Sequence, residues 1–87
     1  MTQNVYEMLA RERKIGELMF VLEKNGWADL ELIRAMGPLH WSAVAKESGV
    51  GVPSSTTIDE IIRRLERKAM DRERRIASLQ AALRVRA

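Results

Sequence analysis

The sequence predicts an all-α protein of four helices joined by short turns, and three observations carry this prediction. No stretch of the chain shows the alternation of apolar and polar residues that marks a half-buried strand. Three helix-ending signals divide the chain, at Asn25-Gly26, Gly37-Pro38 and Gly49. After them, residues 54–84 hold neither Gly nor Pro, and their apolar side chains recur at alternating spacings of four and three, which is typical of a long helix.

The first helix is expected over residues 4–24. Its apolar residues recur at helical spacing, and Glu12 is the one interruption. Further apolar side chains widen this face toward the end of the helix, which predicts that its second half is buried. Gly26 then ends the helix, because glycine tolerates the left-handed conformation that follows a helix C-terminus. The residues that share the spacing are Val5, Met8, Ile15, Met19 and Leu22.

Two short helices are expected next, over residues 28–36 and 41–48. Gly37-Pro38 ends the first of them, since proline disfavours a helical conformation at the residue before it. Gly49 ends the second, because it permits a tight turn. The aromatic residues expected to pack in the core beside these helices are Trp27 and Trp41.

The last helix is expected to begin in the run of hydroxyl residues at 54–57, each of which is a candidate N-cap. Thr57 with Glu60 has the form of a capping box, and Thr56 with Asp59 is an alternative frame. A helix of roughly 28 residues would be about 42 Å long at 1.5 Å per residue. Because a body this small does not cover such a length, the distal half of the helix is expected to project or to pair.

The long helix carries a ladder of residues at the a and d positions of a heptad repeat. Seven of its nine residues are apolar, so the ladder needs a partner surface. Arg72 occupies a d position, where a buried unpaired guanidinium is costly. It therefore specifies the register, pairs with an acidic residue of a partner, or marks the end of the seam. The nine residues are Ile58, Ile62, Leu65, Ala69, Arg72, Ile76, Leu79, Leu83 and Arg86.

Length and composition bound the function. The 87 residues are expected to form one domain, with an N-terminal helix at 1–26, a core at 27–69 and a helical extension at 70–87. The chain has no cysteine, which excludes disulfides and thiolate chemistry. His40 is the only histidine, and the sequence offers no set of metal ligands or catalytic partners for it. We therefore expect no enzyme activity, no metal and no cofactor.

Charge and hydropathy narrow the partners. No apolar run approaches the ~20 residues of a membrane span, and the start of the chain lacks the pattern of a signal peptide. We expect a cytoplasmic protein with no membrane partner. Residues 1–62 carry six basic and nine acidic side chains, whereas residues 63–87 carry nine basic and three acidic ones. A basic helix suggests phosphate groups or an acidic protein surface as partner, and a solvated arginine-rich face is the alternative.

A series of helix ends and starts gives the middle of the chain a recognisable order. A helix that ends at Gly37-Pro38-Leu39 is followed by a short helix in which Ala45 lies four residues before Gly49. The next helix opens with hydroxyl residues and continues to Leu65-Glu66-Arg67-Lys68. In this order, residues 30–75 resemble the helix-turn-helix core of MarR-type winged-helix DNA-binding regulators. The heptad spacing runs on where that family has its β-wing, so the resemblance implies a trihelical helix-turn-helix with a helical extension.

The resemblance implies a small, dimeric regulator of transcription that binds duplex DNA, with a phage or mobile element as one setting. Hydroxyl groups at a helix start contact phosphates, and basic side chains supply a salt-dependent attraction. Asp59 and Glu60 on the same helix do not suit phosphates, and among base edges only the cytosine amino group suits them. The expected DNA contacts are Lys46, Ser54, Ser55, Thr56, Arg63, Arg64, Arg67, Lys68, Arg74 and Arg75.

A different function follows from the heptad ladder. The chain is alternatively a protein-binding adaptor or anti-activator that uses the helix-turn-helix fold and its heptad helices as a docking surface. For either function we expect a homodimer built from the first and last helices, and packing of the same two stripes within one chain remains open. The residues expected in this dimer or partner interface are Met8, Ile15, Met19, Leu22, Ile76, Leu79 and Leu83.

Overall fold

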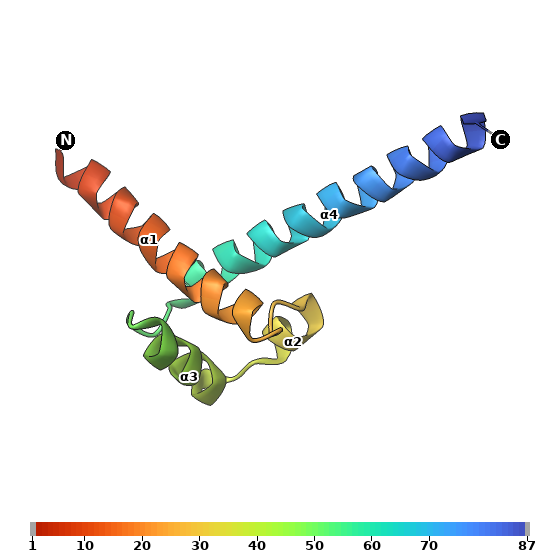
Figure 1. The fold of residues 1–87 in the computed structure, drawn as a ribbon. Coiled ribbons are helices and arrows are strands. Elements are labelled where there is room, and N and C mark those ends of the chain that lie inside the picture. The colour runs from red at the N-terminus through yellow and green to blue at the C-terminus, as the bar shows by residue number, and fades with distance from the viewer. Residues whose placement is uncertain (1, 87) are drawn as a thin grey trace.

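The structure is a computed structural model that describes the backbone of residues 2–86 and the side chains of residues 4–84. It is all-α, as predicted, and the described residues contain no strand. The molecule measures 54 × 35 × 19 Å, because the first and last helices diverge from a small body (Figure 1). The four helices are α1 (Thr2–Lys24), α2 (Leu30–Ala35), α3 (Pro38–Ser48) and α4 (Ser55–Arg86).

The helix starts follow from local hydrogen bonding. Asp29 caps α2, since its carboxylate accepts hydrogen bonds from the second and third backbone N–H groups of that helix at 2.9 and 3.2 Å. Helix α3 begins three residues earlier than predicted, because Pro38 occupies the first helical position, where a missing N–H costs nothing. Of the four candidate caps of α4, Ser54 takes the role, and its Oγ accepts the Thr57 N–H at 3.3 Å. The two capping-box frames that begin at Thr56 and Thr57 are wrong, because both residues lie inside the helix.

The turns form at the predicted glycines. Gly26 has φ +73° and Gly49 has φ +78°, a left-handed conformation that L side chains rarely adopt. The Gly49 N–H donates to the Ala45 carbonyl at 3.0 Å, which closes the last turn of α3. Residues 50–54 then lead to α4 without further helix.

The core lies where the second half of α1 meets α3 and α4 and where α2 covers α4. Helix α3 packs against α1, α2 packs against α4, and α1 crosses α4. The backbones of α3 and α4 do not approach each other along these helices, and a longer connection than a tight turn joins them. Trp41 is buried and Trp27 is half-buried against the core, as predicted. The buried residues are Ile15, Leu18, Met19, Val21, Leu22, Ile33, Trp41, Val44, Ala45, Ile61 and Leu65.

This core corrects part of the predicted interface. Ile15, Met19 and Leu22 share the spacing of Met8, but all three lie inside the monomer and are not available to a second chain. The residues that share the heptad spacing on α1 therefore lie in two different environments. Its first half is exposed, and its second half packs against α3 and α4.

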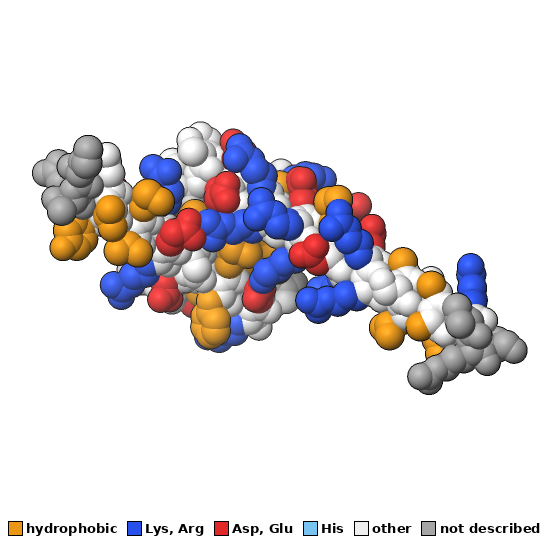
Figure 2. Space-filling model, turned by 90° about the horizontal axis from the view of Figure 1, so that it is seen from above, with side chains coloured by type: hydrophobic (Ala, Val, Ile, Leu, Met, Phe, Trp, Pro, Cys, Tyr) orange, Lys and Arg blue, Asp and Glu red, His pale blue; other side chains and the backbone are white. Residues whose placement is uncertain are grey.

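Two helical arms project from the body. We call residues 4–13 of α1 the α1 arm and residues 70–84 of α4 the α4 arm, and every side chain in both segments is exposed. The two arms point away from each other (Figure 1), so the stripe of the α4 arm does not pack on α1 of the same chain. Figure 2 shows hydrophobic side chains gathered near both ends of the molecule. The large ones are Val5, Tyr6, Met8 and Leu9 on the α1 arm, and Met70, Ile76, Leu79 and Leu83 on the α4 arm.

Candidate nucleic-acid interface

A row of basic side chains runs along the outer face of α4. Arg63, Arg67 and Arg74 are all exposed, and their spacings of four and seven place them on one side of the helix. Helical geometry puts this side opposite Ile61 and Leu65, which face the core. We call these three arginines the outer row.

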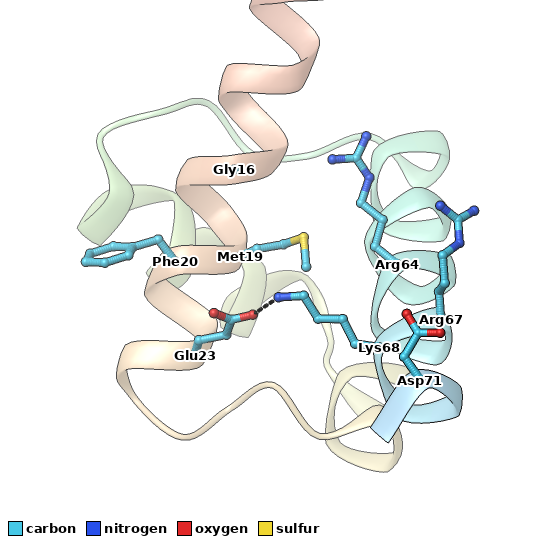
Figure 3. A pocket seen from close by; sticks show the side chains of 8 residues that line it. All are labelled: Gly16, Met19, Phe20, Glu23, Arg64, Arg67, Lys68 and Asp71. Carbon is cyan, nitrogen blue, oxygen red and sulfur yellow. Dashed lines mark hydrogen bonds and ion pairs between the residues drawn. The ribbon is translucent and has the colours of Figure 1, made fainter. Parts of the chain in front are cut away.

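A second set of cations on α4 is already engaged with α1. Arg64 donates to Glu12 Oε1 through Nη2 at 2.6 Å and to Glu60 Oε1 through Nε at 3.1 Å. Lys68 Nζ lies 2.6 Å from Glu23 Oε1, a pair that Figure 3 shows bridging the two helices. These contacts link α1 and α4 at the surface of the molecule, and they occupy both cations with carboxylates of the same chain.

The pairing of Arg64 also changes its acidity and that of its partner. The hydrogen bond from the Arg64 guanidinium lowers the pKa of Glu12 below its ordinary value of 4.5. The same hydrogen bond, together with one to Glu60, raises the pKa of Arg64. Both residues therefore remain charged at neutral pH, and the pair is maintained across the physiological range.

An open groove of about 510 Å³ lies between α1 and α4 beside these ion pairs (Figure 3). Met19 and Phe20 supply its apolar surface, and charged side chains of both signs surround them. Lys68 pairs with Glu23, and Arg67 and Asp71 add one charge of each sign, so the groove does not present one sign to a ligand. Its lining residues are Gly16, Met19, Phe20, Glu23, Arg64, Arg67, Lys68 and Asp71.

The start of α4 mixes hydroxyl and acidic groups. Ser55 and Thr56 are exposed, whereas the Ser54 hydroxyl is used as the helix cap and lies 3.1 Å from the Thr57 hydroxyl. Glu60 Oε2 lies 3.4 Å from Arg63 Nη1. Arg63 of the outer row is therefore partly neutralised by a carboxylate of its own helix.

The predicted DNA contacts therefore do not form one surface. Arg63, Arg67 and Arg74 form the outer row, and helical geometry places Thr56 on the same side of α4. Arg64 and Lys68 face α1 in ion pairs, Ser54 caps the helix, and Ser55 is exposed beside it. Arg75 is exposed one position from the outer row, toward the side of α4 that faces α1. Lys46 is exposed on α3, whose backbone stays away from α4.

Sequence reasoning missed the acidic partners on α1. Glu12 interrupts the apolar spacing of the first helix, and the structure explains the interruption, because this carboxylate faces Arg64 rather than the core. Between α1 and α3, the Asn25 amide donates to Glu47 Oε2 at 3.1 Å, and Lys24 lies 3.4 Å from Glu47 Oε1. The sequence did contain a signal for the contact between Glu12 and Arg64, because Glu12 breaks an otherwise regular apolar spacing.

Comparison of this chain with protein-family models, with curated proteins and with solved structures gives no match. Within the part of the chain that the structure describes, no helix is both long and apolar enough to cross a membrane. The described residues also contain no cluster of three or more acidic or histidine side chains placed to hold a metal ion.

Proposed function

We propose that the protein binds duplex DNA through the outer face of α4, with the phosphate backbone as the main point of contact. The outer row carries this proposal, since Arg63, Arg67 and Arg74 are exposed on one side of a long helix, opposite the core. The first and last of them are separated by eleven residues, or about 16 Å along the helix axis. Three cations at this spacing suit the regularly charged edge of a nucleic-acid duplex.

The surroundings of the row favour backbone contact over base reading. Asp59 is exposed close to the row, and a carboxylate there repels phosphates and suits only the amino groups among the base edges in the major groove. The ion pairs of Arg64 and Lys68 with α1 hold α4 in place without using the outer row. We infer weak sequence preference and strong dependence on salt, and regulation of transcription from such binding is part of the proposal.

Fluorescence anisotropy with a labelled duplex tests the proposal. The double variant of Arg63→Ala and Arg67→Ala should weaken binding to all duplex sequences alike. Each phosphate contact contributes about 0.9 to the slope of log affinity against log salt, so the double variant should lower that slope by about 1.8. Arg13→Ala is the matched control, because Arg13 is exposed on the α1 arm and carries the same charge. Equal losses in the control and the double variant would refute a role for the outer row.

A protein-binding adaptor is the second candidate, and the apolar side chains of the two arms favour it. Leu79 and Leu83 are about two-thirds exposed, and such side chains on a projecting helix are typical of docking surfaces. Under this function, Leu79→Asp should abolish capture of a protein partner while Arg67→Ala leaves it intact. A partner whose binding depends instead on Arg67 and on salt would argue against docking through the arms.

A further inference from the structure

The α4 arm is a helix without cover. All fifteen side chains from residue 70 to residue 84 are exposed, and among the described residues only Asp71 and Arg72, next to the body, line hollows that α1 or α2 also lines. An isolated helix of this length is marginal in water, because its stability depends on packing of an apolar face. Three large apolar side chains nonetheless lie on one side of it, at heptad positions: Ile76, Leu79 and Leu83.

We propose that the α4 arm pairs with the α4 arm of a second copy of this chain in an antiparallel two-stranded coiled coil. In this pairing Ile76 lies level with the partner's Leu79, and Leu79 lies level with the partner's Ile76. Leu83 then packs beside the aliphatic part of the partner's Arg72. This self-association depends on the α4 arm alone and does not rest on DNA binding.

The width of the apolar stripe selects the α4 arm over the α1 arm as the self-pairing segment. Ile76, Leu79 and Leu83 fall within a narrow sector of the helix, which matches the seam of a two-stranded coil. On the α1 arm, Tyr6 and Met8 lie on nearly opposite sides of the helix. An apolar surface that broad does not define one seam.

Charge decides between parallel and antiparallel pairing. A parallel in-register pair would place Arg72 of both chains in the same d layer, where two guanidinium groups meet in the seam. Antiparallel pairing separates the two Arg72 side chains by eleven residues along the coil, or about 16 Å, which exceeds a Debye length at physiological salt.

The body sets the register. With Ile76 level with the partner's Leu79, the overlap of the two arms ends near Asp71, next to the half-buried Ala69. A shift of one heptad toward the body would require the partner's Leu83 to reach Leu65, which is already buried beneath α2. A shift in the other direction keeps only Leu79 and Leu83 in mutual contact. The chosen register thus pairs the whole α4 arm without entering the body.

The extent of the seam implies a modest affinity. Fifteen residues make an overlap of about 22 Å, and each arm contributes only three large apolar side chains to the seam, Ile76, Leu79 and Leu83. The dimer should therefore dissociate on dilution. Light scattering should give twice the monomer mass of 9.9 kDa at high concentration and approach the monomer mass when the chain is diluted.

Engineered cysteines test the orientation, since the natural chain has none. Arg72→Cys and Leu83→Cys chains are prepared separately, and the second carries a size tag. Under a mild oxidant, a mixture of the two should form a mixed disulfide, because the two positions share a layer. Each chain alone should cross-link poorly, since like positions are about 16 Å apart, beyond the 4.4–6.8 Å between Cα atoms that a disulfide spans.

Several outcomes would overturn the proposal. Efficient cross-linking of each single-cysteine chain with itself would establish parallel pairing. A mixed disulfide between Met8→Cys and Leu79→Cys chains in place of the predicted one would make the α1 arm the occupant. A monomer mass at every concentration would remove self-pairing altogether. Because none of these measurements includes DNA, they stand apart from the test of the outer row.

A pair of matched variants checks the seam without cysteine. Leu79→Asp places a carboxylate in the seam and should convert the dimer to monomer, whereas Ser78→Asp adds the same charge outside the seam and should not. Both positions are exposed and lie outside the body, so the tryptophan fluorescence of the core should be unchanged in both variants. Equal effects of the two variants on mass would contradict the assigned seam.

Discussion

The division of α4 into a buried part and an exposed arm can be tested with one substitution made at two positions. Ile61 is fully buried in the core, while Ile76 is 49% exposed on the same helix. Replacing Ile61 with Ala removes three carbon groups from the core, or about 2.4 kcal/mol at ~0.8 kcal/mol for each. The cavity left behind adds to this loss, so Ile61→Ala should lower the free energy of unfolding by about 3–4 kcal/mol.

That loss is large for a chain of this size. A stability of ~0.05–0.15 kcal/mol per residue gives about 4–13 kcal/mol in total for this length. Ile61→Ala should therefore shift the midpoint of urea unfolding strongly, or unfold the chain outright. Ile76→Ala should cost less than about 1 kcal/mol in dilute solution, because its side chain touches solvent rather than core atoms.

Urea unfolding followed by tryptophan fluorescence measures both effects, since Trp41 is buried and Trp27 packs against the core. The measurement belongs at concentrations low enough for the chain to be monomeric, where pairing of the arms does not contribute. Equal losses from Ile61→Ala and Ile76→Ala under these conditions would refute the separation of body and arm.

Three further predictions concern single contacts. Because Arg64 lowers the pKa of Glu12 in the folded chain, the stability that this pair contributes is complete above pH about 4.5 and is lost as pH falls through the lowered pKa; Glu12→Gln should flatten that part of an acid-unfolding curve measured by circular dichroism. Gly49→Ala should cost about 1 kcal/mol in urea unfolding because of the positive φ, although nothing crowds a Cβ there, and Gly37→Ala, at negative φ, should cost less. Ser54→Ala should lower the thermal midpoint through the loss of about 1 kcal/mol of cap, and an unchanged midpoint would deny the capping role.

The number of helices and most of their ends were predictable because they depend on local chemistry. Gly26 and Gly49 mark helix ends whatever surrounds them, since only the backbone conformation is at stake. The cap of α4 was narrowed only to four consecutive hydroxyl residues, because they offer several equivalent frames and the choice among them depends on where the preceding connection leaves the core.

The division between core and interface was not predictable from spacing alone. A heptad pattern says which residues share a face but not what covers that face, so Met8 and Ile15 look alike in sequence although one is exposed and the other buried. The same limit applies to charge. The basic run of α4 looks like one surface in the sequence, yet Arg64 is paired with Glu12, which lies 52 residues away in the chain, whereas Arg67 belongs to the outer row.

The absence of a glycine or proline in α4 has a mechanical consequence. One uninterrupted helix contains the outer row, the residues that anchor it to the body, and the α4 arm, so these parts turn together as a single rod. A tilt of about 10° at the body would carry the tip of the arm through about 4 Å, given a length of about 22 Å beyond the body. A ligand that binds the outer row and tilts α4 would therefore also move the tip of the arm. The ion pairs of Glu12 and Glu23 with α4 oppose such a tilt.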